Sequence, residues 1–266
     1  MREPDARDSA RVLAIALVPI AAAMGLAYWR AGAVANVLVQ VSFFLIPLVY
    51  AHRAGFGALA GNGFAPLRVR QVAFVLLASL GTFWLLNGLT HLQDLAVRAM
   101  GLQKQAEAQA EQIRQGIEEA QNVGVAPTML LFVVIPPFCE EVFFRGILFR
   151  GLAKRFGIAV GLVGTSMLFA AFHQMDVQKV LMLFVGAYFG TLVYLTGSLW
   201  AGILAHAVNN LAVLTLMWIY KGRLPEFVAP WWMYLLSLVV FALAMTMLAL
   251  DRKDSPQRHG EHRVES

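Results

Sequence analysis

Three hydrophobic stretches of this sequence each contain a pair of polar or aromatic residues four positions apart. The pairs are Glu141 and Arg145, Phe169 and His173, and His206 and Asn210, with Glu140 directly before the first. Residues four apart share one face of a helix. If the three helices converge, a carboxylate, two imidazoles and an amide meet in a desolvated site. Such groups could activate water: a carboxylate or histidine takes its proton, while histidine and asparagine donors stabilise an oxyanion.

The two adjacent glutamates of the first stretch are expected to have different roles. Glu141 faces Arg145 in the orientation that favours an ion pair, and this pairing reduces the cost of burying both charges. Glu140 is rotated by about 100° around the helix and is the carboxylate left to react. The preceding Pro136 and Pro137 are expected to break or kink the helix, which gives water and substrate a way to Glu140. The alternative is a buried ion-pair network that only joins helices.

The two histidines also have structural interpretations. A lone histidine near the end of a span, such as His173, is more often an interfacial or packing residue, and the His206–Asn210 pair could simply hydrogen-bond between helices. Glu140, His173 and His206 are also a plausible zinc set with a fourth position for water. The residues alone do not separate a metal mechanism from a metal-free one. Cys139 is not needed as a nucleophile, because cysteine is readily accommodated in apolar helices.

The composition indicates which elements must position these residues. Of the 266 residues, 59% are hydrophobic and 14% are charged, whereas a soluble domain is about 45–50% apolar and about 25% charged. A membrane span needs about 20 mostly apolar residues. Eight stretches approach that length: 12–29, 33–50, 72–90, 128–149, 157–174, 177–195, 199–219 and 231–250. We therefore predict an all-α, polytopic integral membrane protein with about eight transmembrane helices and an active site within the helical bundle.

The basic residues predict the orientation of the chain in the membrane. With the N-terminus inside, thirteen Lys and Arg residues lie in the inner segments and seven in the outer ones. The positive-inside rule therefore favours cytoplasmic N- and C-termini. The net charge of +5 has this topological explanation and is no argument for nucleic-acid binding. We interpret the first apolar stretch as a retained helix rather than a signal peptide, because no convincing cleavage site ends it.

The predicted spans divide the chain into four parts. These are N-terminal transmembrane helices (1–90), an extramembrane helical segment (91–127), a catalytic core (128–220), and a last transmembrane helix with a polar tail (221–266). The net acidic segment 91–127 is expected to be a solvated surface helix, with a cap over a substrate entrance as the alternative. The glycine-rich residues 54–65 predict a flexible loop, because their spacing fits neither phosphate-binding fingerprint.

The order and spacing of the motifs resemble a known family. Three patterns carry the resemblance: Glu-Glu-x-x-x-Arg at Glu140–Arg145, Phe-x-x-x-His at Phe169–His173, and His-x-x-x-Asn at His206–Asn210. Together they look like the motifs of the CAAX protease and bacteriocin-processing (CPBP, or Abi) intramembrane endopeptidases. The resemblance covers about residues 125–215, and no motif position departs from the family pattern.

The resemblance implies a role for each of these residues. Glu140 would activate water with His173 as its partner, and His206 and Asn210 would form the oxyanion site. Glu141, Arg145 and Phe169 would support and shape the site. The implied mechanism is metal-free and needs no cofactor, and zinc held through Glu140, His173 and His206 remains the alternative.

The resemblance further implies a hydrolase, a protease that cuts membrane-anchored or lipid-modified protein substrates near their C-termini. Eukaryotic relatives remove three C-terminal residues from prenylated proteins. Bacterial relatives include bacteriocin-processing or immunity proteins and the myxosortases, which cut C-terminal sorting tails. We expect a bacterial inner-membrane protein whose partners are the lipid bilayer and a membrane-anchored protein or peptide, without nucleic acid. The sequence does not determine the oligomeric state.

Two other functions fit the same composition. A non-proteolytic immunity or scaffold protein of the same fold would bind a toxin or partner, but binding alone would not require all four of the implied catalytic residues. A small transporter could carry protons on its buried glutamate and histidine side chains, but the sequence has no evident inverted repeat of the kind that many transporters contain. The protease is therefore the preferred function.

Overall fold

The computed structural model describes residues 3–28, 32–55, 63–173, 179–220 and 228–253, and every regular element among them is a helix. The helices are α1 (Ala6–Tyr28), α2 (Gly32–Arg53), α3 (Val69–Ala99), α4 (Gln103–Val123), α5 (Val125–Met129), η1 (Leu130–Val134), α6 (Ile135–Glu141), η2 (Val142–Phe149), α7 (Arg150–Phe156), α8 (Ile158–Phe172), α9 (Lys179–Thr196), α10 (Leu199–Ile219) and α11 (Trp231–Lys253). The elements η1 and η2 are π-helical, with wider turns than an α-helix.

The structure confirms an all-α polytopic membrane protein. Within the described residues, five helical segments are long and apolar enough to cross a membrane: Val69–Ala99, Val125–Phe156, Lys179–Thr196, Leu199–Ile219 and Trp231–Arg252. Shorter apolar helices lie at Val37–Arg53 and Ile158–Phe172, and the first predicted span falls on α1. The short connection expected near His173 lies at 174–178, outside the described residues, as do residues 56–62 of the expected glycine-rich loop.

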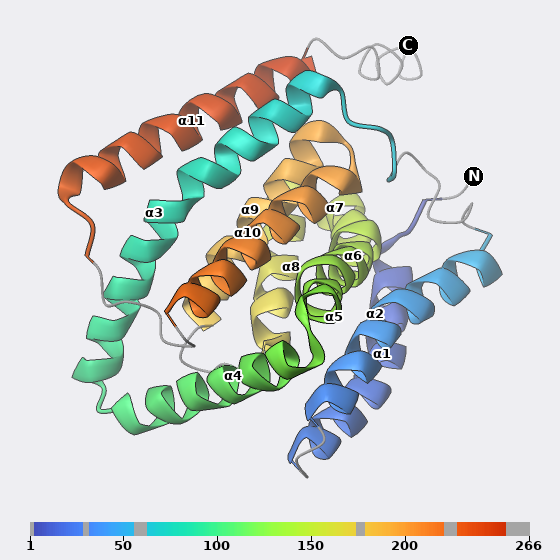
Figure 1. Cartoon of the computed structure of the whole chain (residues 1–266). Helices are drawn as coiled ribbons and strands as arrows, with labels where there is room; N and C mark the ends of the chain where they lie inside the picture. Colours follow the sequence, from blue (N-terminus) through green and yellow to red (C-terminus); the bar gives the residue numbers. More distant parts are fainter. Residues whose placement is uncertain (1–2, 29–31, 56–62, 174–178, 221–227, 254–266) are drawn as a thin grey trace.

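The helices form three groups around a central segment (Figure 1). The antiparallel pair α1 and α2 packs on α6, η2 and α7, whereas the pair α3 and α11 lies on the other side of the bundle. Helices α8, α9 and α10 pack between the two pairs. Helix α4 crosses one end of the bundle and connects α3 to α5. Because α3 continues to Ala99, residues 91–99 extend a membrane helix rather than begin the acidic segment.

The α3–α11 pair is held by close backbone packing and by one charge cluster. A Cβ atom on Gly81 would lie 2.7 Å from the backbone nitrogen of Phe241, so the two helices touch at a position without a side chain. At the ends of the same helices, Arg68 and Arg70 form ion pairs with Asp251. These contacts fix the outer wall of the bundle.

The segment Val125–Phe156 is the most enclosed of the five spans, since 44% of its most apolar window is buried against 17–33% for the others. Of the break or kink expected at Pro136 and Pro137, the break does not occur, since the helical segment continues through both prolines. The backbone instead widens into η1 just before the prolines, and the Ile135 N–H bonds to the carbonyl five residues earlier, at Leu130. A wider turn accommodates the missing donors without interrupting the span.

Candidate active site

Glu140 lies about midway along the Val125–Phe156 segment and is 8% exposed. Its Oε1 accepts a hydrogen bond from Gln40 Nε2 of α2 at 2.9 Å. Its Oε2 has no hydrogen-bond partner among the described residues and lies 3.9 Å from His206 Nε2 of α10. That distance is too long for a direct hydrogen bond but suits a bridging water molecule.

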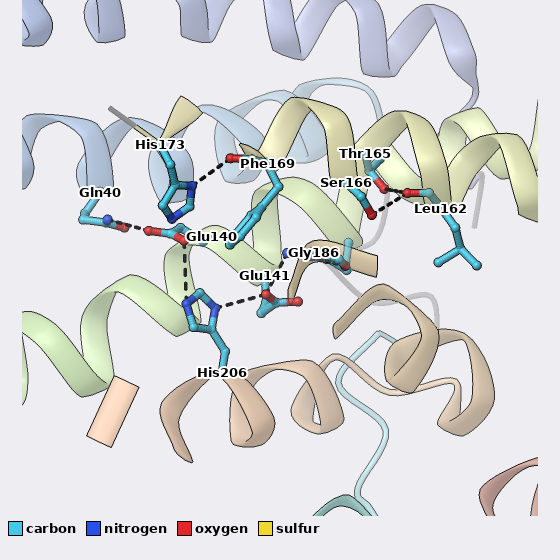
Figure 2. Close-up of polar contacts among 11 residues, drawn as sticks. Gln40, Glu140, Glu141, Leu162, Thr165, Ser166, Phe169, His173, Gly186 and His206 are labelled. Carbon is cyan, nitrogen blue, oxygen red and sulfur yellow. Dashed lines mark hydrogen bonds and ion pairs between the residues drawn. The ribbon is translucent and has the colours of Figure 1, made fainter. Parts of the chain in front are cut away.

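Glu141 holds a second, tighter cluster beside Glu140 (Figure 2). Its Oε1 accepts from Arg145 Nη1 at 2.8 Å, which is the i, i+4 pair that the sequence predicts, and all of Glu141 and Arg145 is buried. His206 Nδ1 lies 3.2 Å from the same oxygen. Arg145 Nη2 also donates to the Gly186 carbonyl of α9 at 2.7 Å. Glu141 therefore orients His206 as well as Arg145, a contact that the sequence analysis did not anticipate.

The Glu141 contact determines what His206 can do. A carboxylate paired with arginine only accepts hydrogen bonds, so His206 Nδ1 must carry a proton. The other nitrogen, Nε2, then accepts a hydrogen bond in the neutral ring and donates one in the protonated ring. Because Nε2 faces Glu140 Oε2, donation to an oxyanion at this point requires the protonated ring.

The close approach of Glu141 to α10 depends on Gly202. A Cβ atom at this position would lie 2.6 Å from Glu141 Oε2 and 2.8 Å from a methyl group of Val193. Any side chain on Gly202 would therefore push on the carboxylate that orients His206.

Phe169 lies between the two imidazoles. Its ring centroid is 4.5 Å from that of His173 and 5.9 Å from that of His206, and the Arg145 guanidinium lies 4.8 Å from the same centroid. The Phe189 ring stacks on the His206 ring, with 4.6 Å between the two ring centroids. The apolar rings fix the orientation of both histidines and keep the charges in a dry environment.

His173 ends α8, where the backbone turns from helical to extended geometry. Its Nδ1 lies 2.7 Å from the Phe169 carbonyl oxygen, which only accepts, so Nδ1 carries the proton and Nε2 of the neutral ring is an acceptor. In Figure 2 the ring points toward Glu140. In this view His173 and His206 lie on opposite sides of the Glu140 side chain.

Asn210 is placed one turn along α10 from His206, and its amide donates to the Phe132 carbonyl at 3.0 Å. That carbonyl lacks a helical partner for a clear reason. The donors for an α-helical or π-helical bond to Phe132 would come from residues 136 and 137, and both are prolines. Asn210 therefore satisfies a carbonyl that the double proline leaves unpaired, and its second amide hydrogen remains available for another acceptor.

The structure brings six of the seven predicted residues into contact with one another: Glu140, Glu141, Arg145, Phe169, His173 and His206. The seventh, Asn210, contacts η1 at the border of this cluster. Gln40 was missed, although an amide within the apolar run Val37–Val41 was a readable signal. Among the residues that the structure describes, no group of three His, Cys, Asp or Glu side chains is arranged to hold a metal ion.

One comparison with known proteins bears on this site. The family model described as Rce1-like, "Type II CAAX prenyl endopeptidase Rce1-like", matches residues 122–212. The match confirms the resemblance over about a third of the chain and is consistent with a CPBP-family intramembrane protease. It supports an integral membrane peptidase in general and includes all seven predicted site residues, but not Gln40. No curated protein and no solved structure matches the chain.

Proposed function

We propose that this protein is an intramembrane endopeptidase that hydrolyses a peptide bond near the C-terminus of membrane-anchored or lipid-modified protein substrates. One observation carries the proposal: a buried carboxylate, Glu140, is held through one oxygen and keeps the other open opposite His206. This arrangement lies within the region that matches the endopeptidase family. A carboxylate so placed is a general base for a water molecule.

In the proposed mechanism, water binds between Glu140 Oε2 and the His206 ring, with His173 Nε2 as a further acceptor. Glu140 takes one proton from the water, and the water oxygen forms a bond to the scissile carbonyl carbon. The resulting oxyanion accepts hydrogen bonds from protonated His206 and from the second amide hydrogen of Asn210. When the carbon–nitrogen bond breaks, Glu140 returns its proton to the leaving amine, which restores the starting charges.

Two features favour this chemistry in the interior of a membrane protein. Arg145 pairs with Glu141, so it does not compete with the proton that the Glu140 carboxylate takes from water. The aromatic rings of Phe169 and Phe189 pack against the His206 ring and lower the local polarity, which strengthens an electrostatic contact from His206 to a developing oxyanion.

The proposed location is a bacterial inner membrane with both termini in the cytoplasm. The support comes from the positive-inside rule and from the fold, because the C-terminal ends of α2, α7 and α11 and the N-terminal end of α3 lie toward the same end of the bundle. Each of these helix ends carries basic residues in the sequence: Arg53, Lys154 and Arg155, Arg252 and Lys253, and Arg68 and Arg70. A maturation or sorting protease for membrane-anchored proteins fits this setting.

The test is Glu140→Gln in the intact protein, with the C-termini of host membrane proteins mapped by mass spectrometry. We expect uncleaved precursors to accumulate as they do when the protein is absent. Identical C-termini in wild-type and Glu140→Gln cells would contradict the protease and favour a scaffold. Because the proposal assigns water activation to Glu140 without a metal, the purified protein is also expected to keep its activity in EDTA, and a loss restored by zinc would contradict that part.

A further inference from the structure

Gln40 is the one described residue of α2 that hydrogen-bonds to the predicted site residues, and it lies outside the residues that match the endopeptidase family. We propose that Gln40 is a positioning residue that fixes the Glu140 carboxylate in its reactive orientation. This role rests on the proposed peptidase function and adds to it a component from the N-terminal helices. The amide is 7% exposed, so its hydrogen bond is made in a largely desolvated place.

The chemistry of the contact fixes its direction. Gln40 Nε2 donates to Glu140 Oε1 at 2.9 Å, and Gln40 Oε1 has no partner among the described residues. A flipped amide would place two oxygens against each other, so an ionised Glu140 selects the observed orientation. With Oε1 held in this way, rotation of the carboxylate is restricted and Oε2 stays opposite His206 Nε2.

The same amide suits a group that gains and loses a proton. In the proposed reaction the proton from water goes to Oε2, the oxygen without a hydrogen-bond partner, and Oε1 remains an acceptor. The amide N–H can therefore donate to Oε1 both when Glu140 is ionised and when its Oε2 is protonated. Gln40 thus holds the carboxyl group through both halves of the proposed reaction, and as a neutral partner it does not oppose protonation as a cation would.

The position of Gln40 is itself well fixed. Phe43 lies three residues further along the same buried side of α2 and is 3% exposed. Its ring packs on Phe143 and Phe144 of η2 at 4.7 and 5.4 Å and on Phe172, next to His173, at 5.7 Å. The opposite side of α2, with Val37, Val41 and Leu45, is exposed. Helix α2 thus packs on both elements that present Glu140 and His173.

The experiment compares Gln40→Met with a matched control, Gln71→Met. Gln71 makes the same contact elsewhere, since its Nε2 donates to the buried Asp251 at 2.9 Å in the α3–α11 cluster. Full-length proteins are purified, reconstituted in liposomes and assayed with a fluorogenic peptide that ends in a farnesylated Cys-aliphatic-aliphatic-Met sequence. Thermal unfolding is measured on the same samples, together with Glu140→Gln and the Gln40→Met/Glu140→Gln double variant.

We expect Gln40→Met to lower kcat by about tenfold or more with KM unchanged, because it removes a hydrogen bond to a charged group that the chemical step uses. In the Glu140→Gln background the same change should cause no further loss. Gln71→Met should lower the melting temperature and leave kcat unchanged.

Four outcomes would overturn the inference. A Gln40→Met protein with wild-type kcat, alongside an inactive Glu140→Gln protein, would refute the role of Gln40 while the peptidase function stands. Gln40→Met and Gln71→Met could also lower kcat equally, in proportion to the loss of folded protein. That result would show that the Gln40–Glu140 contact is merely structural. No cleavage by the wild-type protein, or full activity of Glu140→Gln, would refute the proposed function and this role with it.

Discussion

Asp251 and Glu140 are buried carboxylates that each accept a hydrogen bond from a glutamine, yet their other contacts differ. Asp251 at the end of α11 accepts from Gln71 and also forms ion pairs with Arg68 and Arg70. Both of its oxygens have cationic partners, and the two arginines reach solvent, with 38% and 54% of their side chains exposed. This cluster joins the ends of two helices, and an arginine lies beside each of its carboxylate oxygens.

Glu140 has the same glutamine contact but, among the residues that the structure describes, no arginine bound to either oxygen. The arginine of its neighbourhood, Arg145, is bound to Glu141 instead. One Glu140 oxygen therefore faces an imidazole across 3.9 Å, a separation that a water molecule can fill. The comparison teaches that burial and a hydrogen bond do not by themselves mark a reactive carboxylate. What distinguishes Glu140 is that the nearby cation, Arg145, pairs with Glu141 instead.

The largest expected difference between the two clusters concerns activity. Glu140→Gln should lower the cleavage rate by about 10²–10⁴-fold, the usual contribution of a general base, with little change in the unfolding temperature. The matched change Asp251→Asn should do the opposite and lower stability while the rate is kept. Cleavage rates and thermal unfolding of both purified variants test this. A much lower cleavage rate in folded Asp251→Asn protein would contradict the distinction between a reactive Glu140 and a structural Asp251.

The next difference concerns the arginines. Arg145→Met leaves the buried Glu141 charge without its main partner and should cost about 3–5 kcal/mol of unfolding free energy. Arg70→Met, whose side chain is 54% exposed, should cost about 0–1 kcal/mol. Denaturation in detergent measures both changes. Similar costs at the two positions would mean that the Glu141–Arg145 pair is better solvated than its burial indicates.

Two glycines test whether the same packing defect has different consequences in the two regions. Gly202→Ala would press on the Glu141 carboxylate and Gly81→Ala on the backbone of Phe241, and each should cost about 1–3 kcal/mol through overpacking. Only Gly202→Ala is expected to reduce activity in the protein that remains folded, because it displaces the group that orients His206. Activity per folded molecule separates the two, and equal losses would contradict this role of Glu141.

The smallest effect is expected at the border of the site. Asn210→Ala should cost about 0.6–2 kcal/mol by leaving the Phe132 carbonyl unpaired within the membrane. Adding Pro136→Ala supplies a backbone N–H and should restore part of that stability. Activity should stay low in the double variant if the second amide hydrogen serves the oxyanion. Recovery of both stability and activity would make Asn210 a purely structural residue.

Much of this architecture could be predicted from hydrophobic length and spacing. The helical membrane fold and the Glu141–Arg145 pair follow from local rules, because a helix repeat places residues four apart on one face. The continuous path through Pro136 and Pro137 could not be predicted, since whether a helix breaks or widens depends on partners elsewhere. Here Asn210, 78 residues away, binds the Phe132 carbonyl that both prolines leave without a donor.

The sequence by itself determined which side chains could do chemistry and that they lie in hydrophobic helices, because residue type and periodicity are local properties. Only the tertiary structure decided which of these side chains pair with one another. Glu141 binds both Arg145 and His206, Glu140 is left with Gln40 from a helix 100 residues away, and Gly202 makes room for the carboxylate. Such contacts depend on how separate helices pack, and no spacing within one helix encodes them.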